Sequence, residues 1–284
     1  MLAPKMYSTL GIIGYPISHS ISPIFQQSAI DFYGLPDIYK PYEIAPDQLG
    51  QFMSDLKNTD AKGINVTVPH KQAVIPYLDS IDEWAVKAGA VNTIVKSGSK
   101  LLGYNTDGYG FIEGLKRSCD VSLFDCNVLI FGAGGSARAV LLSLIDASVN
   151  SICIANRTLS KAVELREIAR NNGITCEAVS IEDKEFKTLV GKANIIVNCT
   201  TIGMKNDIGV LPFGSEELHR ETIVYDLVYN PIQTSMITEG EKSGCKIISG
   251  IDMLVFQGAK SFEFWFKKQA PIEVMLKSAK SAIL

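Results

Sequence analysis

One short stretch decides the fold of this chain: Phe131-Gly132-Ala133-Gly134-Gly135-Ser136-Ala137-Arg138-Ala139, which follows the apolar run Asn127 to Phe131. A glycine turn between a strand and a helix is the setting that the Gly-x-Gly-x-x-Gly/Ala dinucleotide fingerprint requires. Gly132 permits the tight turn, Gly134 lets the backbone approach a pyrophosphate, and small Ala137 lets the helix pack on the strand. The alternative is a merely structural glycine turn. The cofactor-binding candidates of this turn are Gly132, Ala133, Gly134, Gly135 and Ser136.

The residues beyond the turn continue a strand and helix alternation. We expect a helix over Ser136 to Ile145 and one over Ser160 to Asn171. Further strands are expected over Ser151–Ala155, Ala193–Cys199, Thr222–Val228 and Lys246–Ser249. This order predicts a doubly wound parallel sheet.

The end of the second strand indicates which dinucleotide binds. An enzyme selective for NAD would carry Asp or Glu there, whereas this chain has Asn156-Arg157-Thr158. Arg157 can grip a 2′-phosphate that a carboxylate would repel, so we expect NADP(H). Alternatively, Thr158 simply caps the next helix. The cofactor-binding candidates of this segment are Asn156, Arg157, Thr158 and Lys161.

The length of 284 residues favours two domains. The first third alternates strands and helices and ends in a hairpin, Ala90–Val95 with Lys100–Tyr104, which we expect at the edge of a small α/β sheet. The domain boundary is expected near Asp107. The last stretch, Ile251 to Leu284, is helical in pattern, and its docking place cannot be deduced from periodicity.

Composition narrows the class of protein. Apolar residues make up 46%, charged residues 20%, and the net charge is −3, so we expect neither a nucleic-acid nor a membrane partner. No apolar run has the length of a signal peptide or a spanning helix, which predicts a cytoplasmic protein. The six cysteines are widely spaced, some in apolar runs, so we expect buried free thiols and no metal site.

Four polar segments of the first domain stand at expected strand ends: Tyr15–Pro23, Asn65–Lys71, Ala90–Thr93 and Tyr104–Gly108. Taken singly they are weak signals. The serines around His19 could cap a helix, Lys71 could be a surface charge, and a carboxylate before glycine usually forms a turn. A Ser-His hydrolase is disfavoured because the chain lacks a Gly-x-Ser-x-Gly elbow.

Taken together, the motifs resemble those of shikimate dehydrogenases, in the same order and over nearly the whole chain. They are Gly14–Pro23, Asn65–Lys71, Gly89–Thr93, Asn105–Gly108, Gly132–Gly135, Asn156–Thr158, Asn198–Met204, Asp226–Pro231 and Gly250–Gln257. One departure is Gln26-Gln27, where the family usually has a His-Asn pair. We interpret it as affecting helix packing or support of the substrate loop more than chemistry.

The resemblance implies NADP-dependent interconversion of 3-dehydroshikimate and shikimate, in aromatic amino acid and chorismate biosynthesis. It implies Lys71 as the acid/base and Asp107 as its partner, and which of the two holds the proton is a coupled question. The implied substrate-binding residues are Ser18, Ser20, Thr67, Asn92, Asp107, Tyr229 and Gln257. The implied further cofactor residues are Thr200, Leu227, Gly250 and Glu83, although Glu83 alone is typical of a surface helix charge.

The resemblance also implies a discontinuous substrate domain, residues 1–107 with 250–284, around an NADP domain of residues 108–249. Two alternatives stay open: a quinate/shikimate dehydrogenase, and a non-catalytic NADP-binding sensor, which would be expected to lose Lys71 or Asp107. Both residues are present. The expected partner is a small-molecule substrate, and the chain is expected to be a monomer or a homodimer.

Overall fold

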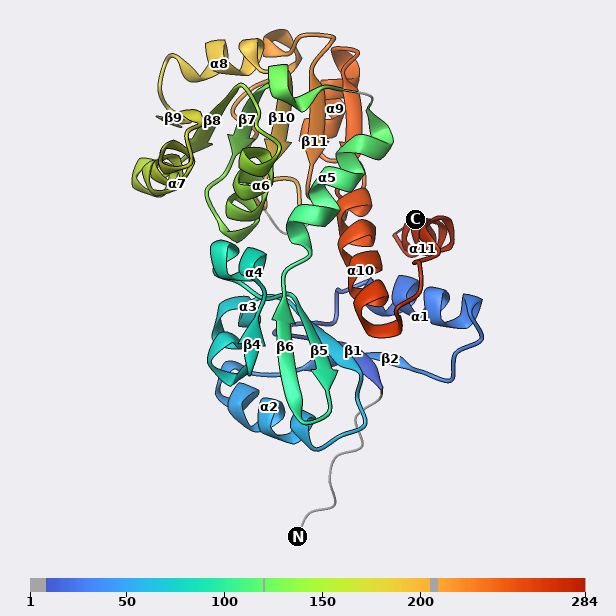
Figure 1. Ribbon diagram of the computed structural model, residues 1–284. Helices are drawn as coiled ribbons and strands as arrows, with labels where there is room; N and C mark the ends of the chain where they lie inside the picture. Colours follow the sequence, from blue (N-terminus) through green and yellow to red (C-terminus); the bar gives the residue numbers. More distant parts are fainter. Residues whose placement is uncertain (1–8, 120, 205–208, 284) are drawn as a thin grey trace. The chain divides into compact units, whose positions relative to one another are not determined.

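The structure is a computed structural model that describes residues 9–119, 121–204 and 209–283. It divides into two compact units (Figure 1). The first unit extends to Gly110 and includes Val255–Ala282, and the second is Phe111–Leu254. The chain passes from one unit to the other within α5 (Asp107–Ser118) and again within α10 (Gly250–Phe266).

The first unit is built on a mixed six-stranded sheet of order β2-β1-β3-β5-β6-β4. Its strands are β1 (Leu10–Gly14), β2 (Tyr39–Glu43), β3 (Gly63–Val66), β4 (Ser80–Ile81), β5 (Thr93–Ser97) and β6 (Lys100–Tyr104). β1 runs parallel to β2 and β3, and the β5–β6 hairpin is antiparallel to β3. The predicted hairpin forms but is not the edge, because β4 pairs beyond β6. A two-residue strand is too short to give a periodic sequence signal.

Helices cover both faces of this sheet. The helices of this unit are α1 (Ser22–Phe32), α2 (Leu49–Lys57), α3 (His70–Ala73), α4 (Glu83–Ala88), the second part of α10, and α11 (Ile272–Ser281), which packs on α1. It also has 3-10 turns at Pro46–Gln48 and Ile75–Tyr77. On one face, α2 and α4 pack on β-strand residues such as Ile64 and Ile94. On the other, Trp265 of α10 donates to the carbonyl of Ile94, and Gly63 leaves room for the indole ring.

Gln26 and Gln27, the departure from the family pattern, are packing residues of α1. Gln26 is buried, and its Nε2 donates to the carbonyl of Gly258 in α10 at 2.8 Å. The Oε1 of Gln27 accepts from the backbone N–H of Tyr39, at the start of β2, at 2.9 Å. Both glutamines therefore attach α1 to its neighbours within the first unit.

The second unit is a parallel six-stranded sheet of order β12-β11-β10-β7-β8-β9. Its strands are β7 (Asn127–Phe131), β8 (Ser151–Asn156), β9 (Thr175–Ser180), β10 (Ile195–Asn198), β11 (Ile223–Asp226) and β12 (Lys246–Ser249). The strand order reverses between β7 and β10, which is the switch point where doubly wound sheets bind ligands. The predicted α/β, doubly wound fold class is confirmed. Strand β9 was not predicted, because half of its residues Thr175-Cys176-Glu177-Ala178-Val179-Ser180 are polar and it lies at the sheet edge.

Two layers of helices enclose this sheet. The helices are α6 (Gly135–Asp146), α7 (Leu159–Asn171), α8 (Phe186–Lys192) and α9 (Ser235–Lys242), with 3-10 turns at Leu123–Asp125 and Ser215–Glu217. Residues of α5, α6 and α7 form one core with inward side chains such as Ile130 and Ile154. Residues of α8 and α9 form a second core with Leu129 and Val224 on the opposite face.

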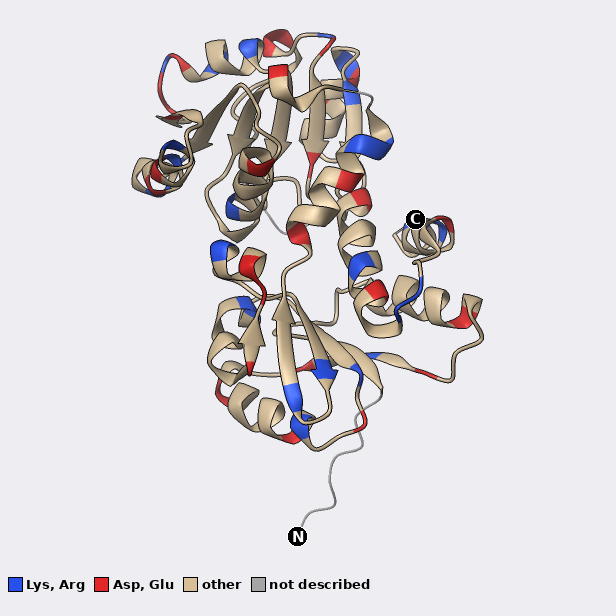
Figure 2. Cartoon of the chain, in the orientation of Figure 1, with Lys and Arg blue, Asp and Glu red and all other residues tan. Residues whose placement is uncertain are grey.

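Charged residues of both signs are interspersed along the two units (Figure 2). Within the described part of the chain, no helix is long and apolar enough to cross a membrane.

Candidate functional site

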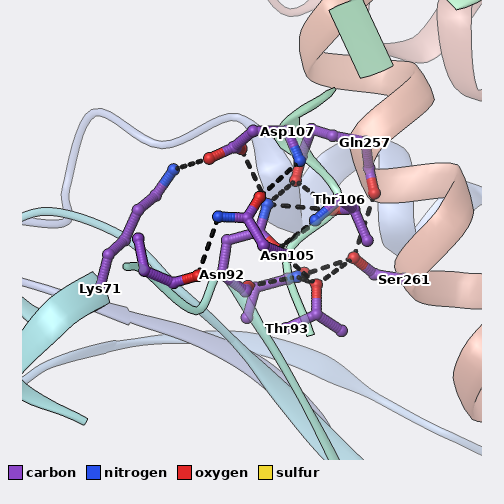
Figure 3. A network of polar contacts seen from close by, with 10 residues as sticks. Lys71, Asn92, Thr93, Asn105, Thr106, Asp107, Gln257 and Ser261 are labelled. Atoms are coloured by element: carbon purple, nitrogen blue, oxygen red, sulfur yellow. Dashed lines mark hydrogen bonds and ion pairs between the residues drawn. The ribbon is translucent and has the colours of Figure 1, made fainter. Parts of the chain in front are cut away.

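Lys71 and Asp107 form an ion pair at one end of the first sheet. Their Nζ and Oδ2 atoms lie 2.7 Å apart, with side chains 29% and 13% exposed (Figure 3). The fold places Lys71 firmly, because the neighbouring His70 ring is buried against the carbonyl of Ile44 and the Lys71 carbonyl accepts from Val91 N–H. Asp107 is the first residue of α5. The predicted pair is therefore in contact, sheltered but still reachable from solvent.

Asn92 holds the second oxygen of Asp107 through its side-chain amide (Figure 3). Its Oδ1 accepts from the backbone N–H of Thr106 at 2.9 Å, and its Nδ2 donates to Asp107 Oδ1 at 2.8 Å. A backbone N–H can only donate, so the amide cannot be reversed. The same Nδ2 lies 3.2 Å from Oε1 of Gln257. We call Lys71, Asn92, Thr106, Asp107 and Gln257 the Lys71–Asp107 cluster.

The buried hydroxyl groups of Thr93 and Ser261 connect to this cluster through Asn92. Thr93 Oγ1 lies 3.0 Å from Asn92 Oδ1 and 2.7 Å from Ser261 Oγ, and Asn65 Nδ2 donates to both hydroxyls. Sequence reasoning did not assign roles to Thr93, Thr106 or Ser261. Thr93 and Thr106 are next in sequence to the assigned residues Asn92 and Asp107, which is a signal that could have identified them. Ser261 lies far away in the sequence, in α10, and has no such signal.

The remaining substrate candidates of the first unit lie at the same end of the sheet but outside the cluster. Thr67 follows β3, and its backbone N–H bonds to Ile13 of β1. Ser18 is exposed and Ser20 half-buried in the turn after β1. In the described chain no hydrogen bond joins the side chains of these three residues to the cluster. The alternative role of the serines, as caps of α1, is not observed. The N-cap of α1 is Ile21, without a side-chain bond. Ser20 Oγ accepts only a long hydrogen bond, 3.3 Å, from the backbone N–H of Ser22.

The glycine turn of the second unit, Gly132–Gly135, lies at the switch point of its sheet, between β7 and β10. Gly132 has φ +111°, and a Cβ there would lie 2.9 Å from Cγ2 of Thr200, which follows β10. A Cβ on exposed Gly134 or Gly135 would meet nothing within 4 Å, so the backbone at the start of α6 is open. Ala133 and Ser136 border this opening. Free N–H groups at the first turn of a twelve-residue helix suit the phosphates of a dinucleotide.

Arg157 and Lys161 are exposed cations at the carboxyl end of β8 and in the first turn of α7. Neither side chain makes a hydrogen bond or ion pair with another residue that the structure describes. Thr158 occupies the N-cap position of α7, but its side chain makes no capping bond. Asn156 Nδ2 donates to the carbonyl of Thr158 at 2.9 Å and so shapes the turn. This arrangement leaves the cations and the hydroxyl available to an anionic ligand.

Other cofactor candidates divide between the units. Leu227 and Gly250 touch at the carboxyl edge of the second sheet, where a Cβ on Gly250 would clash with the Leu227 carbonyl oxygen. Tyr229, a substrate candidate, follows in the same turn, and burial raises the pKa of its phenol. Glu83 belongs to the first unit, where it is exposed in the first turn of α4 and the helix dipole favours an acidic residue. Its assignment to the cofactor stays a prediction.

Comparison with known proteins places the chain in a family. Three family models match the chain: "Shikimate dehydrogenase substrate binding domain" over residues 12–94, "Shikimate / quinate 5-dehydrogenase" over residues 115–205, and "Shikimate 5'-dehydrogenase C-terminal domain" over residues 250–280. A shikimate dehydrogenase (NADP(+)) of Geobacillus kaustophilus is 38% identical over 261 residues, which are 92% of this chain and 93% of the relative.

Two solved structures are similar over nearly their whole lengths. A shikimate dehydrogenase in complex with NADP+ is 35% identical, with a TM-score of 0.89, over 100% of this chain and 99% of that one. A quinate dehydrogenase from Corynebacterium glutamicum in complex with NAD is 27% identical, with a TM-score of 0.85, over 96% and 98%. The resemblance predicted from the motifs is confirmed, and the chain belongs to the shikimate dehydrogenase family.

Proposed function

We propose that the chain is an NADP-dependent shikimate dehydrogenase, which reversibly reduces 3-dehydroshikimate to shikimate in aromatic amino acid biosynthesis. The observation that carries this proposal is the Lys71–Asp107 ion pair, oriented by Asn92 at one end of a sheet. Oxidation of a secondary alcohol needs a group that accepts the hydroxyl proton as hydride leaves. A lysine and carboxylate in contact can accept that proton and return it.

Lys71 is the acid in reduction and the base in oxidation. In reduction its Nζ donates a proton to the substrate carbonyl oxygen, and in oxidation the neutral amine takes the proton back. Asp107 stabilises the ammonium form through the 2.7 Å contact and adds an acceptor for the substrate. Asn92 keeps the carboxylate in place during both directions. Holding the reacting groups in one geometry removes much of the orientational cost of the reaction.

Neutral donors hold the substrate. We assign Ser18 and Ser20 to its carboxylate, because both hydroxyls lie in the turn after β1 without a strong partner of their own. Thr67, Asn92 and Gln257 are assigned to the ring hydroxyls. Tyr229, in the second unit, stays a candidate for substrate binding. Several hydrogen bonds from neutral groups fix orientation without the ground-state affinity of an arginine clamp.

The second unit fits NADP(H), which supplies the hydride when bound. The open backbone at Gly134 and Gly135 and the amides at the start of α6 suit the pyrophosphate. Arg157, supported by Asn156, Thr158 and Lys161, suits the 2′-phosphate. Thr200, Leu227 and Gly250 are assigned to the remainder of the nucleotide. We assign residues 108–249 to the NADP domain and residues 1–107 with 250–284 to the substrate domain, and we place the enzyme in the cytoplasm, where its free cysteines stay reduced.

The test is a comparison of four reactions followed by NADPH or NADH absorbance: shikimate and quinate, each with NADP and with NAD. We expect shikimate with NADP to give the highest kcat/KM. Higher kcat/KM with quinate would favour the quinate/shikimate alternative. The absence of turnover with either acid, in a protein that still binds NADPH, would instead favour the non-catalytic sensor.

A further inference from the structure

Asp226 is a fully buried carboxylate that the proposed mechanism does not use. It is the last residue of β11, and no described lysine, arginine or histidine forms an ion pair with it. Burial is the main reason that its pKa is raised above the usual 3.8. An acidic group buried without a cation destabilises a fold, and such departures from good core design concentrate at functional sites.

The hydrogen-bond donors to Asp226 come from three separate segments. Oδ1 accepts from Nδ2 of Asn198, at the end of β10, at 2.8 Å, and from the backbone N–H of Val228 at 2.9 Å. Oδ2 accepts from the hydroxyl of Thr234, the N-cap of α9, at 2.6 Å. One carboxylate therefore connects the ends of two neighbouring strands and the start of a helix. We call Asn198, Asp226, Val228 and Thr234 the Asp226 cluster.

Asn198 links Asp226 to the turn that carries Thr200. Its Nδ2 faces Asp226, so its Oδ1 is directed at Thr200, where it accepts from the backbone N–H at 3.0 Å and from the hydroxyl at 2.7 Å. Thr200 in turn packs against Gly132 of the dinucleotide turn. The turn ends at Gly203, with φ +101°, which packs on the side chain of Thr234. Both ends of the turn after β10 therefore depend on the Asp226 cluster.

Asp226 holds a second turn through its own backbone. The Val228 bond folds the chain directly after β11, and Leu227 N–H bonds to the carbonyl of Asn198. This turn carries Leu227 and Tyr229, the candidates for cofactor and substrate. A neutral amide at position 226 could keep the bonds to Oδ1. It would place an N–H₂ group where the Thr234 hydroxyl donates, leaving that hydroxyl proton without an acceptor.

We propose that Asp226 is a positioning residue for the cofactor: from inside the sheet, it holds the turns after β10 and β11 in the arrangement that binds NADP(H). It acts through Thr200 and Leu227 without touching the nucleotide, because its own side chain is fully buried. This proposal rests on the proposed function, which supplies the cofactor.

The test measures NADPH binding to the purified full-length chain by fluorescence titration. Asp226→Asn should raise the Kd for NADPH on the order of tenfold, as expected for the loss of one charge-assisted hydrogen bond. Turnover at saturating NADPH should fall much less than affinity, since Lys71 and Asp107 are untouched. Thr222→Val is the matched control: it removes a buried hydroxyl, bonded to the Ala193 carbonyl at 3.1 Å, just before β11 at the opposite end of that strand.

A second pair of variants covers the case in which Asp226→Asn does not fold. Thr234→Val should weaken NADPH binding in the same direction, and Thr234→Ser, which keeps the hydroxyl, should restore it. Unchanged NADPH affinity in folded Asp226→Asn or in Thr234→Val would overturn the proposal, as would an equal loss in Thr222→Val. Wild-type protein that fails to bind NADPH would overturn the proposed function itself, which distinguishes the two failures.

Discussion

Each unit has a polar cluster at one end of its sheet. The two clusters differ in the groups that surround their carboxylate. In the Lys71–Asp107 cluster, the carboxylate meets a cation and both side chains keep some exposure. In the Asp226 cluster, the carboxylate is fully buried among neutral donors. A paired, reachable carboxylate suits proton transfer to a substrate, whereas a sealed one suits the holding of turns. The difference separates a chemical role from a supporting one within the same chain.

The largest effect is expected from the reacting pair. Lys71→Ala should lower kcat on the order of 10²–10⁴-fold and leave shikimate affinity within a few fold, because a general acid or base acts mainly in the transition state. The measurement is steady-state turnover with a separate binding titration. Lys57→Ala is the matched control, since Lys57 forms a 3.1 Å ion pair with Asp79, a more exposed carboxylate in the same unit. Normal turnover in Lys71→Ala would remove Lys71 from the mechanism.

Asp107→Asn tests the other half of the pair. The amide can still accept from Asn92, but it no longer carries the charge that Lys71 contacts at 2.7 Å. We therefore expect a large loss of kcat, smaller than for Lys71→Ala, in the same assay. A variant with normal kcat and only weaker shikimate binding would move Asp107 to the residues that hold the substrate.

Arg157→Ala tests whether the second unit recognises the 2′-phosphate. Loss of one charge-assisted contact should weaken NADP binding by roughly 10- to 150-fold and hardly affect NAD, which lacks the phosphate. The NADP/NAD ratio of kcat/KM therefore collapses through the NADP value alone. Arg166→Ala, which removes a half-buried cation of α7 that is paired with Glu167, is the control. Equal weakening of both cofactors would make Arg157 structural.

Ser18→Ala and Ser20→Ala test substrate binding in the first unit. Each should raise the KM for shikimate by about tenfold, near the lower end for a hydrogen bond to a charged group, because water can reach this turn. The kcat should change little and NADPH affinity not at all. If both variants bind shikimate normally, the serines have only a local role in the turn.

The smallest effect concerns the pH dependence of stability. Burial raises the folded-state pKa of Asp226 above 3.8, so the folded protein binds this proton more tightly than the unfolded chain does. The resulting stabilisation is present at low pH and is lost as pH rises through the raised pKa. The free energy of unfolding of wild type, relative to Asp226→Asn, should therefore fall as pH rises above 3.8, by at most about 1.4 kcal/mol per pH unit. Urea unfolding over a pH series measures this, and a flat difference would contradict it.

Local patterns predicted much of this molecule. The glycine turn, the strand before it and the helix after it lie where they were predicted. Tight turns and helical periodicity depend on residues that are close in the sequence, so they can be predicted from it. β9 and β4 were missed because their stability comes from pairing with a neighbouring strand and not from an apolar pattern. The site divides in the same way: Lys71 and Asp107 belong to recognisable motifs, whereas Ser261 joins Asn92's support only through the tertiary fold. Asp226 lies in the motif Asp226–Pro231, but its neighbours in the sequence do not indicate that it is buried.

The return of α10 and α11 to the first unit has a consequence for the order in which the protein is made. The second unit is one continuous segment and can fold as it leaves the ribosome. The first unit must wait, since Trp265, which covers β3 and β5, is translated roughly ten to thirty seconds after Gly110 at ordinary elongation rates. During that interval one face of its sheet lacks the cover of α10, and α1 lacks its packing partner α11. The part of the first unit that precedes residue 111 therefore leaves apolar sheet surface uncovered until the residues after 254 have been made.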